Sequence, residues 1–260
     1  MTAKSGEAAA ILFENWQQRT RVDGLPDECR PRDRAAGYAA QAEVVHLSGQ
    51  KVVGWKIAAT SAAGQQHIGV DGPLAGPLLA NRVLTSGATV PLDGNIMKVA
   101  EAEFCFHFGR SLPKRTEPYT QAEVLEAIDA LHPAIEVPDS RYNNFARVGA
   151  PQLIADTACA CWFVLGPATS ADWRSRHLVT HSVTAYKNGQ PAGTGSGANV
   201  LGDPRVAVTW LVNELRTFGD GVQKTQIVTT GTCVIPFAIA PGDGLRMDFG
   251  DFGSVEARIS

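Results

Sequence analysis

The sequence predicts an α+β fold. The first 50 residues have the apolar spacing of helices, whereas most of the remaining chain alternates apolar and polar residues as β-strands do. Only two further helices interrupt these strands, so helices and strands do not alternate as they would in a doubly wound parallel sheet. We therefore expect a helical N-terminal region, residues 1–50, and a mixed-sheet domain, residues 51–260, in one compact unit.

Two helices are predicted in the N-terminal region. The first carries apolar residues at helical spacing, namely Ala8, Leu12, Phe13 and Trp16. The second covers about residues 32–47, because it follows Pro31 and ends before Ser48 and Gly49.

Two later helices have clear boundary signals. Thr120 and Glu123 form a capping box, and the helix is expected over 119–132, with an apolar stripe of Val124, Leu125, Ile128 and Leu131. Asp203 and Pro204 start the other helix, and Gly219 closes it. Its buried face is expected to consist of Ala207, Trp210, Leu211, Leu215 and Phe218.

The other segments are predicted to be strands and their connections. Residues 52–59 form a strand, and Asn188-Gly189 is typical of a hairpin turn. Residues 245–249 and 255–259 alternate in polarity as strands do. Residues 64–76 are expected to form a loop over a site.

Composition excludes several classes of protein. There are 23 Lys and Arg residues against 26 Asp and Glu residues, which is not the basic balance of a nucleic-acid-binding protein. No apolar run resembles a secretory signal or a membrane span. The five cysteines are odd in number and contain no CxxC pair, which suits free thiols in a reducing cytoplasm.

One strand carries two carboxylates on one side. In the segment 98–109, KVAEAEFCFHFG, alternation places Glu101 and Glu103 on one face and only apolar residues on the other. The two backbone positions are about 6.5–7 Å apart, so the side chains can converge on a hard cation such as Mg²⁺ or Mn²⁺. The pattern is also typical of a solvated outer face.

Two further charged residues lie in apolar strands. Glu136, in AIEVPD, needs a metal or a partner such as Arg141 if its strand is central. Lys56, in VVGWKIAATS, is expected to have a lowered pKa and to act as a base or acid. The alternative for Lys56 is a side chain that reaches solvent at a strand edge.

Several motifs together resemble those of a known family. They are GWKIAATS, GVDGP, EAEFCFHFGRSL, ALHPAIEVPDSR, IADTACACWFVLG and VTTG with the later PGD and GSV. In this order they resemble the 2-keto-4-pentenoate hydratase and 4-oxalocrotonate decarboxylase family, within the fumarylacetoacetate hydrolase superfamily. The resemblance implies a rolled mixed sheet and Mg²⁺ or Mn²⁺ held by Glu101, Glu103 and Glu136, with Lys56 as the site lysine.

The resemblance also implies a reaction. The substrate would be a 2-oxo acid or its 2-hydroxy-2,4-dienoate enol, which chelates the cation while Lys56 moves a proton. Water addition by a hydratase in aromatic-compound catabolism is the main expectation. A decarboxylase, an acylpyruvate C–C hydrolase with His67 as its histidine, and an inactive partner subunit are the alternatives. We expect a homo-oligomer and leave association with a pathway enzyme open.

Four further residues are candidates for contact with substrate, namely Arg141, Thr230, Leu74 and Cys159. Arg141 can pair with a carboxylate or form a salt bridge with Asp139 or Glu136. Thr230 offers a hydroxyl. Two departures from the family pattern concern Leu74 and Ala75, where hydratases carry an acid, and Thr157 and Cys159, where relatives have Asn and Ser. We expect Leu74 and Ala75 to form an apolar pocket wall.

Two other motifs are weak. GTGSGA, residues 193–198, resembles a dinucleotide-binding fingerprint, but the next helix starts several residues too late. His177 and His181 are four residues apart, but they lack the glutamate and the helix of a zinc peptidase.

Overall fold

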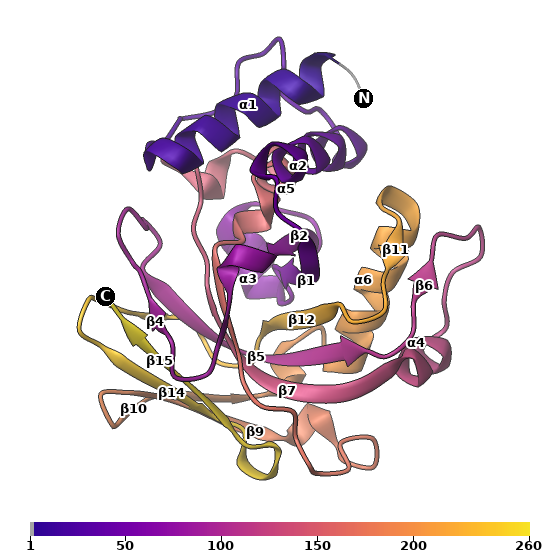
Figure 1. The fold of residues 1–260 in the computed structure, drawn as a ribbon, viewed down its shortest axis with the longest axis vertical. Coiled ribbons are helices and arrows are strands. Elements are labelled where there is room, and N and C mark those ends of the chain that lie inside the picture. Colours follow the sequence, from indigo (N-terminus) through magenta and orange to yellow (C-terminus); the bar gives the residue numbers. More distant parts are fainter. Residues whose placement is uncertain (1–2) are drawn as a thin grey trace.

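A mixed sheet of eight strands forms the centre of the molecule in the computed structural model, which describes residues 3–260 (Figure 1). Two of its strand pairs, β1 with β12 and β3 with β8, are parallel, and the others are antiparallel. The strand order is β2 (Leu74–Leu79), β1 (Val52–Ala58), β12 (Ile227–Thr232), β5 (Val99–Phe108), β7 (Ile128–Val137), β8 (Trp162–Leu165) and β3 (Val83–Thr85), and β13 (Phe237–Ala238) pairs with β5.

A second sheet of five strands packs against the first (Figure 1). Its order is β10 (Gln190–Ser196), β9 (Ser182–Lys187), β14 (Gly244–Asp248), β15 (Ser254–Ile259) and β4 (Thr89–Val90). Asn188 and Gly189 have positive φ angles of 52° and 77°, as a tight hairpin turn requires, so the predicted turn is confirmed. A small ladder joins β11 (Gly221–Val222) to β6 (Leu112–Pro113).

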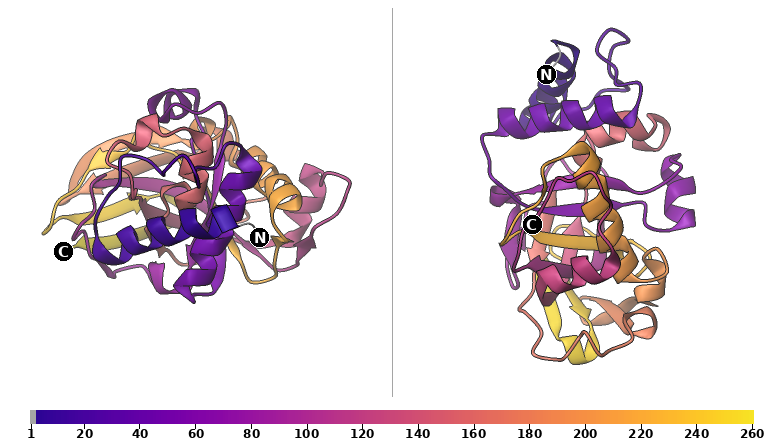
Figure 2. Two further views of the ribbon diagram at one scale, coloured as in Figure 1. Left: turned by 90° about the horizontal axis from the view of Figure 1, so that it is seen from above. Right: turned by 90° about the vertical axis from the view of Figure 1, so that its right-hand side faces the viewer.

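The N-terminal helices lie together at one end of the molecule (Figures 1 and 2). Both were predicted: α1 covers Ala3–Gln18 and α2 covers Arg34–Ser48. Asp33 caps the start of α2 by accepting a hydrogen bond from the Ala36 amide, and Gly49 ends it in the left-handed conformation. These helices rest on α5 (Ala150–Ala155), which comes just before the site described below.

The helix predicted over 119–132 is wrong in its second half. The capping box is present, but α4 covers only Gln121–Ala127 and β7 begins at Ile128. Ile128 and Leu131 pair with Phe108 and Phe106 of β5. Burial against a neighbouring strand therefore outweighs the helical spacing of these apolar residues.

The loop predicted over 64–76 is also partly wrong. Residues Ala62–Ile68 form the short helix α3, because the Ser61 side chain accepts a hydrogen bond from the Gly64 amide and caps it. Gly69 ends α3 with a φ of 64°. Strand β2 follows at Leu74.

The predicted helix after Asp203 is confirmed as α6, Pro204–Phe218. Its buried face differs in detail, because Trp210 is only partly buried and Phe218 is 36% exposed. Val208 and Val212 take their places in the core. Short 3-10 helices complete the chain: Ala80–Arg82, Phe145–Arg147, Thr157–Cys159, Leu178–Thr180, Gly197–Asn199 and Gly250–Phe252.

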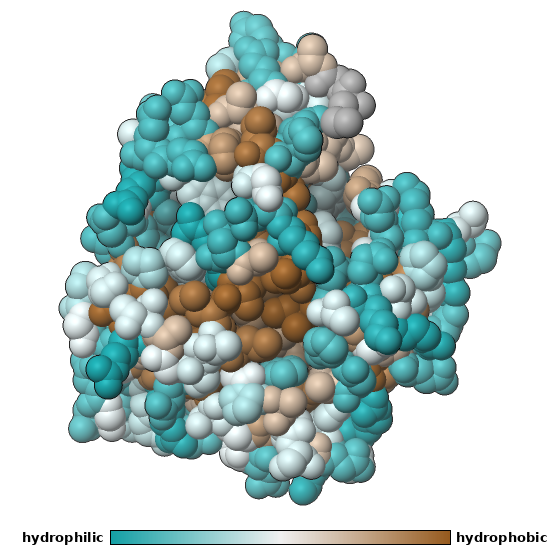
Figure 3. Space-filling view, in the orientation of Figure 1, coloured by the Kyte–Doolittle hydropathy of each residue, from teal (hydrophilic) through white to brown (hydrophobic). Residues whose placement is uncertain are grey.

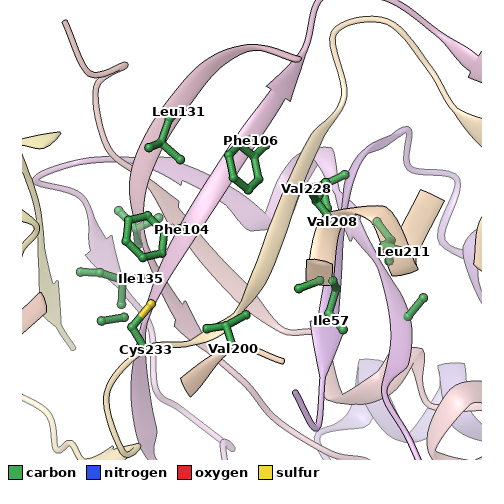
Figure 4. Close-up of a cluster of buried hydrophobic side chains, with 14 of the residues drawn as sticks. Ile57, Phe104, Phe106, Leu131, Ile135, Val200, Val208, Leu211, Val228 and Cys233 are labelled. Atoms are coloured by element: carbon green, nitrogen blue, oxygen red, sulfur yellow. The ribbon is translucent and has the colours of Figure 1, made fainter. Parts of the chain in front are cut away.

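Strand β5 separates the core from the site. Its apolar face, which includes Phe104 and Phe106, is fully buried in the main core with residues of β12 and α6 (Figure 4). Its opposite face carries Glu101 and Glu103. On the molecular surface, apolar residues gather in one area below α3, and hydrophilic residues surround them (Figure 3). Among the described residues, no helix has the length and apolar character needed to span a membrane.

Candidate active site

Three carboxylates meet where β5 and β7 run side by side. Glu101 pairs directly with Glu136 across the two strands, and Glu103 lies two residues further along the same face of β5. One oxygen from each side chain lies within 4.8 Å of the others. Glu103 and Glu136 are almost completely buried, whereas Glu101 keeps some exposure to solvent.

Lys56 reaches the same place from β1. Its ammonium group lies 2.9 Å from Glu136 Oε1 and donates a hydrogen bond of 3.1 Å to the Ala158 carbonyl. Only 3% of Lys56 is exposed, so the lysine does not reach solvent at the strand edge. The structure thus brings together the four charged residues that the sequence singled out.

The electrostatics of this group are set by burial and by its own charges. Burial alone would lower the pKa of Lys56, but the carboxylates of Glu136, Glu101 and Glu103 together outweigh it and raise that pKa. In the metal-free chain, the pKa of Lys56 is therefore raised, not lowered as the sequence predicts. Burial, together with the Glu136 carboxylate, raises the pKa of Glu101 to about 7 and that of Glu103 well above its usual range.

Glu103 is held by groups from β12. The Thr229 hydroxyl donates a short hydrogen bond to Glu103 Oε2, and the Gly231 amide donates another of 2.9 Å to the same oxygen. Gly231 has a φ of 96°, and a Cβ there would lie 2.1 Å from the Thr60 hydroxyl oxygen. Glycine is therefore needed for the amide to approach the carboxylate.

The hydroxyl beside Glu103 belongs to Thr229, a residue that the sequence pattern alone does not single out. Thr230, whose contact with substrate stays a prediction, is buried, and its hydroxyl donates a hydrogen bond of 3.1 Å to the Phe104 carbonyl. Thr229 pairs with Cys105, which shares the carboxylate face of β5. Strand alternation turns Thr230 to the other side, so knowledge of the pairing register would have identified Thr229.

The carboxylate oxygens that remain suit a cation. Glu103 Oε1 and Glu136 Oε2 are buried and accept no hydrogen bond from the described residues, whereas Glu136 Oε1, which is also buried, has the Lys56 ammonium group 2.9 Å away. Buried carboxylate oxygens without donors are costly unless a positive charge balances them. With all groups ionised, the three carboxylates and Lys56 carry an excess of two negative charges. An all-oxygen ligand set of this charge fits a hard divalent cation.

The turn Thr157–Cys159 borders Lys56. All three residues have positive φ angles, of 54°, 51° and 62°, and the middle carbonyl is the one that Lys56 contacts. Cys159 is 7% exposed, and burial raises the pKa of its thiol to about 12. Its predicted contact with substrate stays a prediction.

Arg141 lies behind this turn. Its carboxylate partner is Asp156. The salt bridge to Asp139 or Glu136 that the sequence suggested is therefore not formed. Further hydrogen bonds from its guanidinium go to the Asp156 carbonyl, the Thr157 hydroxyl and the Ala160 carbonyl. Binding of a substrate carboxylate by Arg141 stays a prediction, and these contacts indicate a different role.

Leu74 is fully buried at the start of β2. It pairs with Ala58 while Gly76 pairs with Lys56, so Leu74 shares the sheet face of Lys56. Ala75 pairs with Ile57 on the opposite face. Of the two residues predicted to form a pocket wall, only Leu74 is on the side of the charged cluster.

The weaker motifs lie elsewhere. GTGSGA runs from strand β10 into a 3-10 turn and does not open a helix. The His181 ring bonds to the Phe249 carbonyl. Both residues are far in sequence from Glu101, Glu103 and Glu136. His67 lies on α3, with its ring at the edge of Phe145.

Comparison with known proteins identifies the family. The model of the fumarylacetoacetate hydrolase C-terminal domain matches residues 72–260. The chain belongs to the fumarylacetoacetate hydrolase family. This match includes the strands that carry all three carboxylates, and Lys56 lies just before it.

The proteins similar to this member of the fumarylacetoacetate hydrolase family include enzymes named for two activities. A 2-keto-4-pentenoate hydratase from Paraburkholderia xenovorans is 32% identical, over 97% of this chain and 94% of that protein. A 4-oxalocrotonate decarboxylase from a Pseudomonas species, strain CF600, is 33% identical, over 81% of this chain and 78% of that protein.

A solved structure has a similar fold over the whole chain. It is the 4-oxalocrotonate decarboxylase from Pseudomonas putida G7, complexed with magnesium and adipate. It is 28% identical, with a TM-score of 0.89, and covers 100% of this chain and 99% of that one. The rolled α+β fold expected from the sequence is therefore confirmed.

Proposed function

We propose that this protein is a divalent-metal-dependent lyase that acts on a 2-oxo acid or its 2-hydroxy-2,4-dienoate enol, with water addition as its main reaction. The observation that carries the proposal is the buried group of Glu101, Glu103 and Glu136 beside Lys56. Similarity to hydratases over nearly the whole chain supports the same reaction class.

Glu101, Glu103 and Glu136 would hold the cation, either Mg²⁺ or Mn²⁺. Glu103 Oε1 and Glu136 Oε2 have no hydrogen-bond donor among the described residues, and Thr229 and Gly231 hold the other oxygen of Glu103. A divalent cation here would supply Lewis-acid polarisation of the 2-oxygen of a bound 2-oxo acid.

Lys56 would transfer the proton. Among residues 3–260 it is the only buried lysine, and its ammonium group is held between Glu136 and the Ala158 carbonyl. In this position it can donate a proton to the conjugated chain of the substrate and accept it back. Because Lys56 is buried, that proton does not exchange readily with bulk water during the reaction.

Leu74 would contact the part of the substrate furthest from the carboxylates. It lies on the same sheet face as Lys56 and presents an aliphatic side chain. We infer a preference for dienoates with an apolar substituent. A Leu74→Asp variant should gain activity on a short dienoate relative to a longer alkyl one, and an unchanged preference would contradict this role.

Decarboxylation of a 4-oxalocrotonate-type substrate is the second candidate. It is favoured by the TM-score of 0.89 with a decarboxylase, over the full length of both chains. The same four residues serve either reaction, because both pass through an enolate of the 2-oxo acid. A homo-oligomer in the cytoplasm is the expected setting of the enzyme.

One assay separates the candidates. The protein is incubated with 2-hydroxydienoates or 4-oxalocrotonate and Mg²⁺ or Mn²⁺, while loss of the conjugated chromophore and release of CO₂ are both recorded. Loss without CO₂, with a hydrated product, is expected for the hydratase, and loss with CO₂ identifies the decarboxylase. A Lys56→Met variant should bind the metal but lose roughly 100-fold or more in kcat. No turnover of any of these substrates by the metal-loaded wild type would contradict the proposal.

A further inference from the structure

Lys56 depends on a backbone turn that is held in an unfavourable conformation. The turn Thr157–Cys159 contains no glycine, yet all three residues have φ angles in the left-handed region. Residues with a side chain keep this conformation only when their surroundings impose it. The result is that the Ala158 carbonyl points at Lys56, 3.1 Å from its ammonium nitrogen.

Arg141 joins the two ends of this turn. Its Nη2 donates 2.5 Å to the Asp156 carbonyl before the turn, and its Nη1 donates 3.3 Å to the Ala160 carbonyl after it. Nη2 also donates 2.9 Å to the Thr157 hydroxyl, and Nε pairs with the Asp156 carboxylate. Arg141 is only 1% exposed. The planar fork of an arginine can make these contacts at once, whereas a lysine has a single nitrogen.

The first helix reaches the same arginine. The Arg141 guanidinium lies over the ring of Trp16, 4.7 Å from its centroid. Trp16 belongs to α1, and its ring also lies 5.2 Å from the Arg82 guanidinium, which stacks 4.3 Å from the Trp162 ring on β8. A continuous set of contacts therefore runs from β8 through Arg82, Trp16 and Arg141 to the turn.

We propose that Arg141 and Trp16 are positioning residues for Lys56, so that the N-terminal helix α1 contributes to the active site without touching the substrate. Arg141 imposes the turn that aims the Ala158 carbonyl at the ammonium group, and Trp16 covers the guanidinium and keeps it in place. This role of Lys56 rests on the proposed function, whereas the control of the turn by Arg141 does not.

The proposal is tested with four variants. Arg141→Lys keeps the charge but cannot join both ends of the turn, and Trp16→Leu removes the ring, which Trp16→Phe retains. Leu12→Ala is the matched control. Leu12 is buried in the same helix and, like Trp16, packs in an apolar cluster that includes Ala8 and Val44, but it makes none of these cation contacts. For each variant, kcat, KM, the melting temperature and the calorimetric affinity for Mg²⁺ are measured.

If Arg141 and Trp16 position Lys56, the four variants should differ in kcat in a specific way. Arg141→Lys should lower kcat roughly 10- to 100-fold, because a small displacement of a reacting group has effects of this size, with KM and Mg²⁺ affinity within about 2-fold of wild type. Trp16→Leu should lower kcat about 3- to 10-fold, and Trp16→Phe should restore most of it. Leu12→Ala should lower the melting temperature and leave kcat within about 2-fold.

A second readout needs neither substrate nor metal. Hydrogen exchange by mass spectrometry follows the peptide that contains residues 156–161, whose amides at Cys159 and Ala160 bond within the turn. Arg141→Lys and Trp16→Leu should speed exchange there at least about 10-fold, and peptides from β14 and β15 should not change. The proposal would be overturned if both variants exchanged amide hydrogens in the turn at the wild-type rate. It would also be overturned if Trp16→Leu and Leu12→Ala lost kcat equally. Faster exchange in an enzyme without lyase activity would reject the proposed function alone.

Discussion

Two groups next to Glu103, one side chain and one backbone amide, determine which of its oxygens is available to a cation. Oε2 accepts hydrogen bonds from the Thr229 hydroxyl and the Gly231 amide, whereas Oε1 accepts none from the described residues. Groups that orient a metal ligand in this way typically change metal affinity about 10- to 100-fold when they are removed. We therefore propose that Thr229 supports the cation site without being a ligand.

Replacing Thr229 tests this assignment. Thr229→Val keeps the shape of the side chain but removes the donor, so we expect Mg²⁺ affinity to fall about 10- to 100-fold in a calorimetric titration. Thr230→Val is the matched comparison, because its hydroxyl bonds to the Phe104 carbonyl on the other side of the strand. It should cost about 1 kcal/mol of stability and leave the affinity for Mg²⁺ unchanged. Equal affinities in the two variants would exclude Thr229 from the site.

At the scale of elements, strand β2 packs directly on the turn beside Lys56. A Cβ placed on Gly76 would lie 2.0 Å from the Thr157 carbonyl oxygen, which is closer than any stable contact. Gly76 also pairs with Lys56 across the two strands. The absence of a side chain at this position allows the turn and the lysine to approach each other.

Gly76→Ala should therefore disturb both stability and catalysis. Overpacking of this kind costs about 1–3 kcal/mol, and the displaced turn should lower kcat as well. Gly72→Ala is the control, because a Cβ there meets no atom within 4 Å. Chemical denaturation gives the free energy of unfolding of both variants. A Gly76→Ala protein as stable and active as Gly72→Ala would show that the close contact does not matter.

The elements also show where sequence patterns suffice. Capping signals correctly located the starts of α4 and α6, because caps are local interactions. Strand alternation correctly placed Glu101 and Glu103 on one face of β5. The spacing of Ile128 and Leu131 is compatible with a helix, however, and only pairing with β5 makes them a strand. The turn Thr157–Cys159 has no sequence signal at all, since Arg141, distant in the sequence, imposes it.

At the scale of the whole molecule, the buried carboxylates make stability depend on pH. Burial and Glu136 raise the pKa of Glu101 to about 7 in the folded chain, above the value of about 4.3 expected in an unfolded chain. A carboxyl group with a raised pKa binds its proton more tightly when folded. Its contribution to stability is therefore complete at low pH and is lost as the pH rises through about 7. Lys56, whose pKa is also raised, would lose its contribution only above about 10.4.

A bound metal ion should reverse this loss of stability at high pH. In the presence of a chelator, the melting temperature should be lower at pH 8 than at pH 6. Saturating Mg²⁺ should raise it more at pH 8, because the ligands are then deprotonated and the unfolded chain has no site. Differential scanning calorimetry at the two pH values measures both effects. A larger increase at pH 6 than at pH 8 would contradict the assignment of these carboxylates as ligands.

The proposed metal site is tested most directly by a calorimetric titration of the protein with Mg²⁺ at pH 8. The wild type should bind one ion per chain, and Glu136→Gln, which keeps the shape but removes the charge, should show no measurable binding. Glu126→Gln changes an exposed glutamate on α4 and should bind as the wild type does. Absence of binding by the wild type, or equal binding by Glu136→Gln, would contradict a metal-dependent active site at Glu101, Glu103 and Glu136.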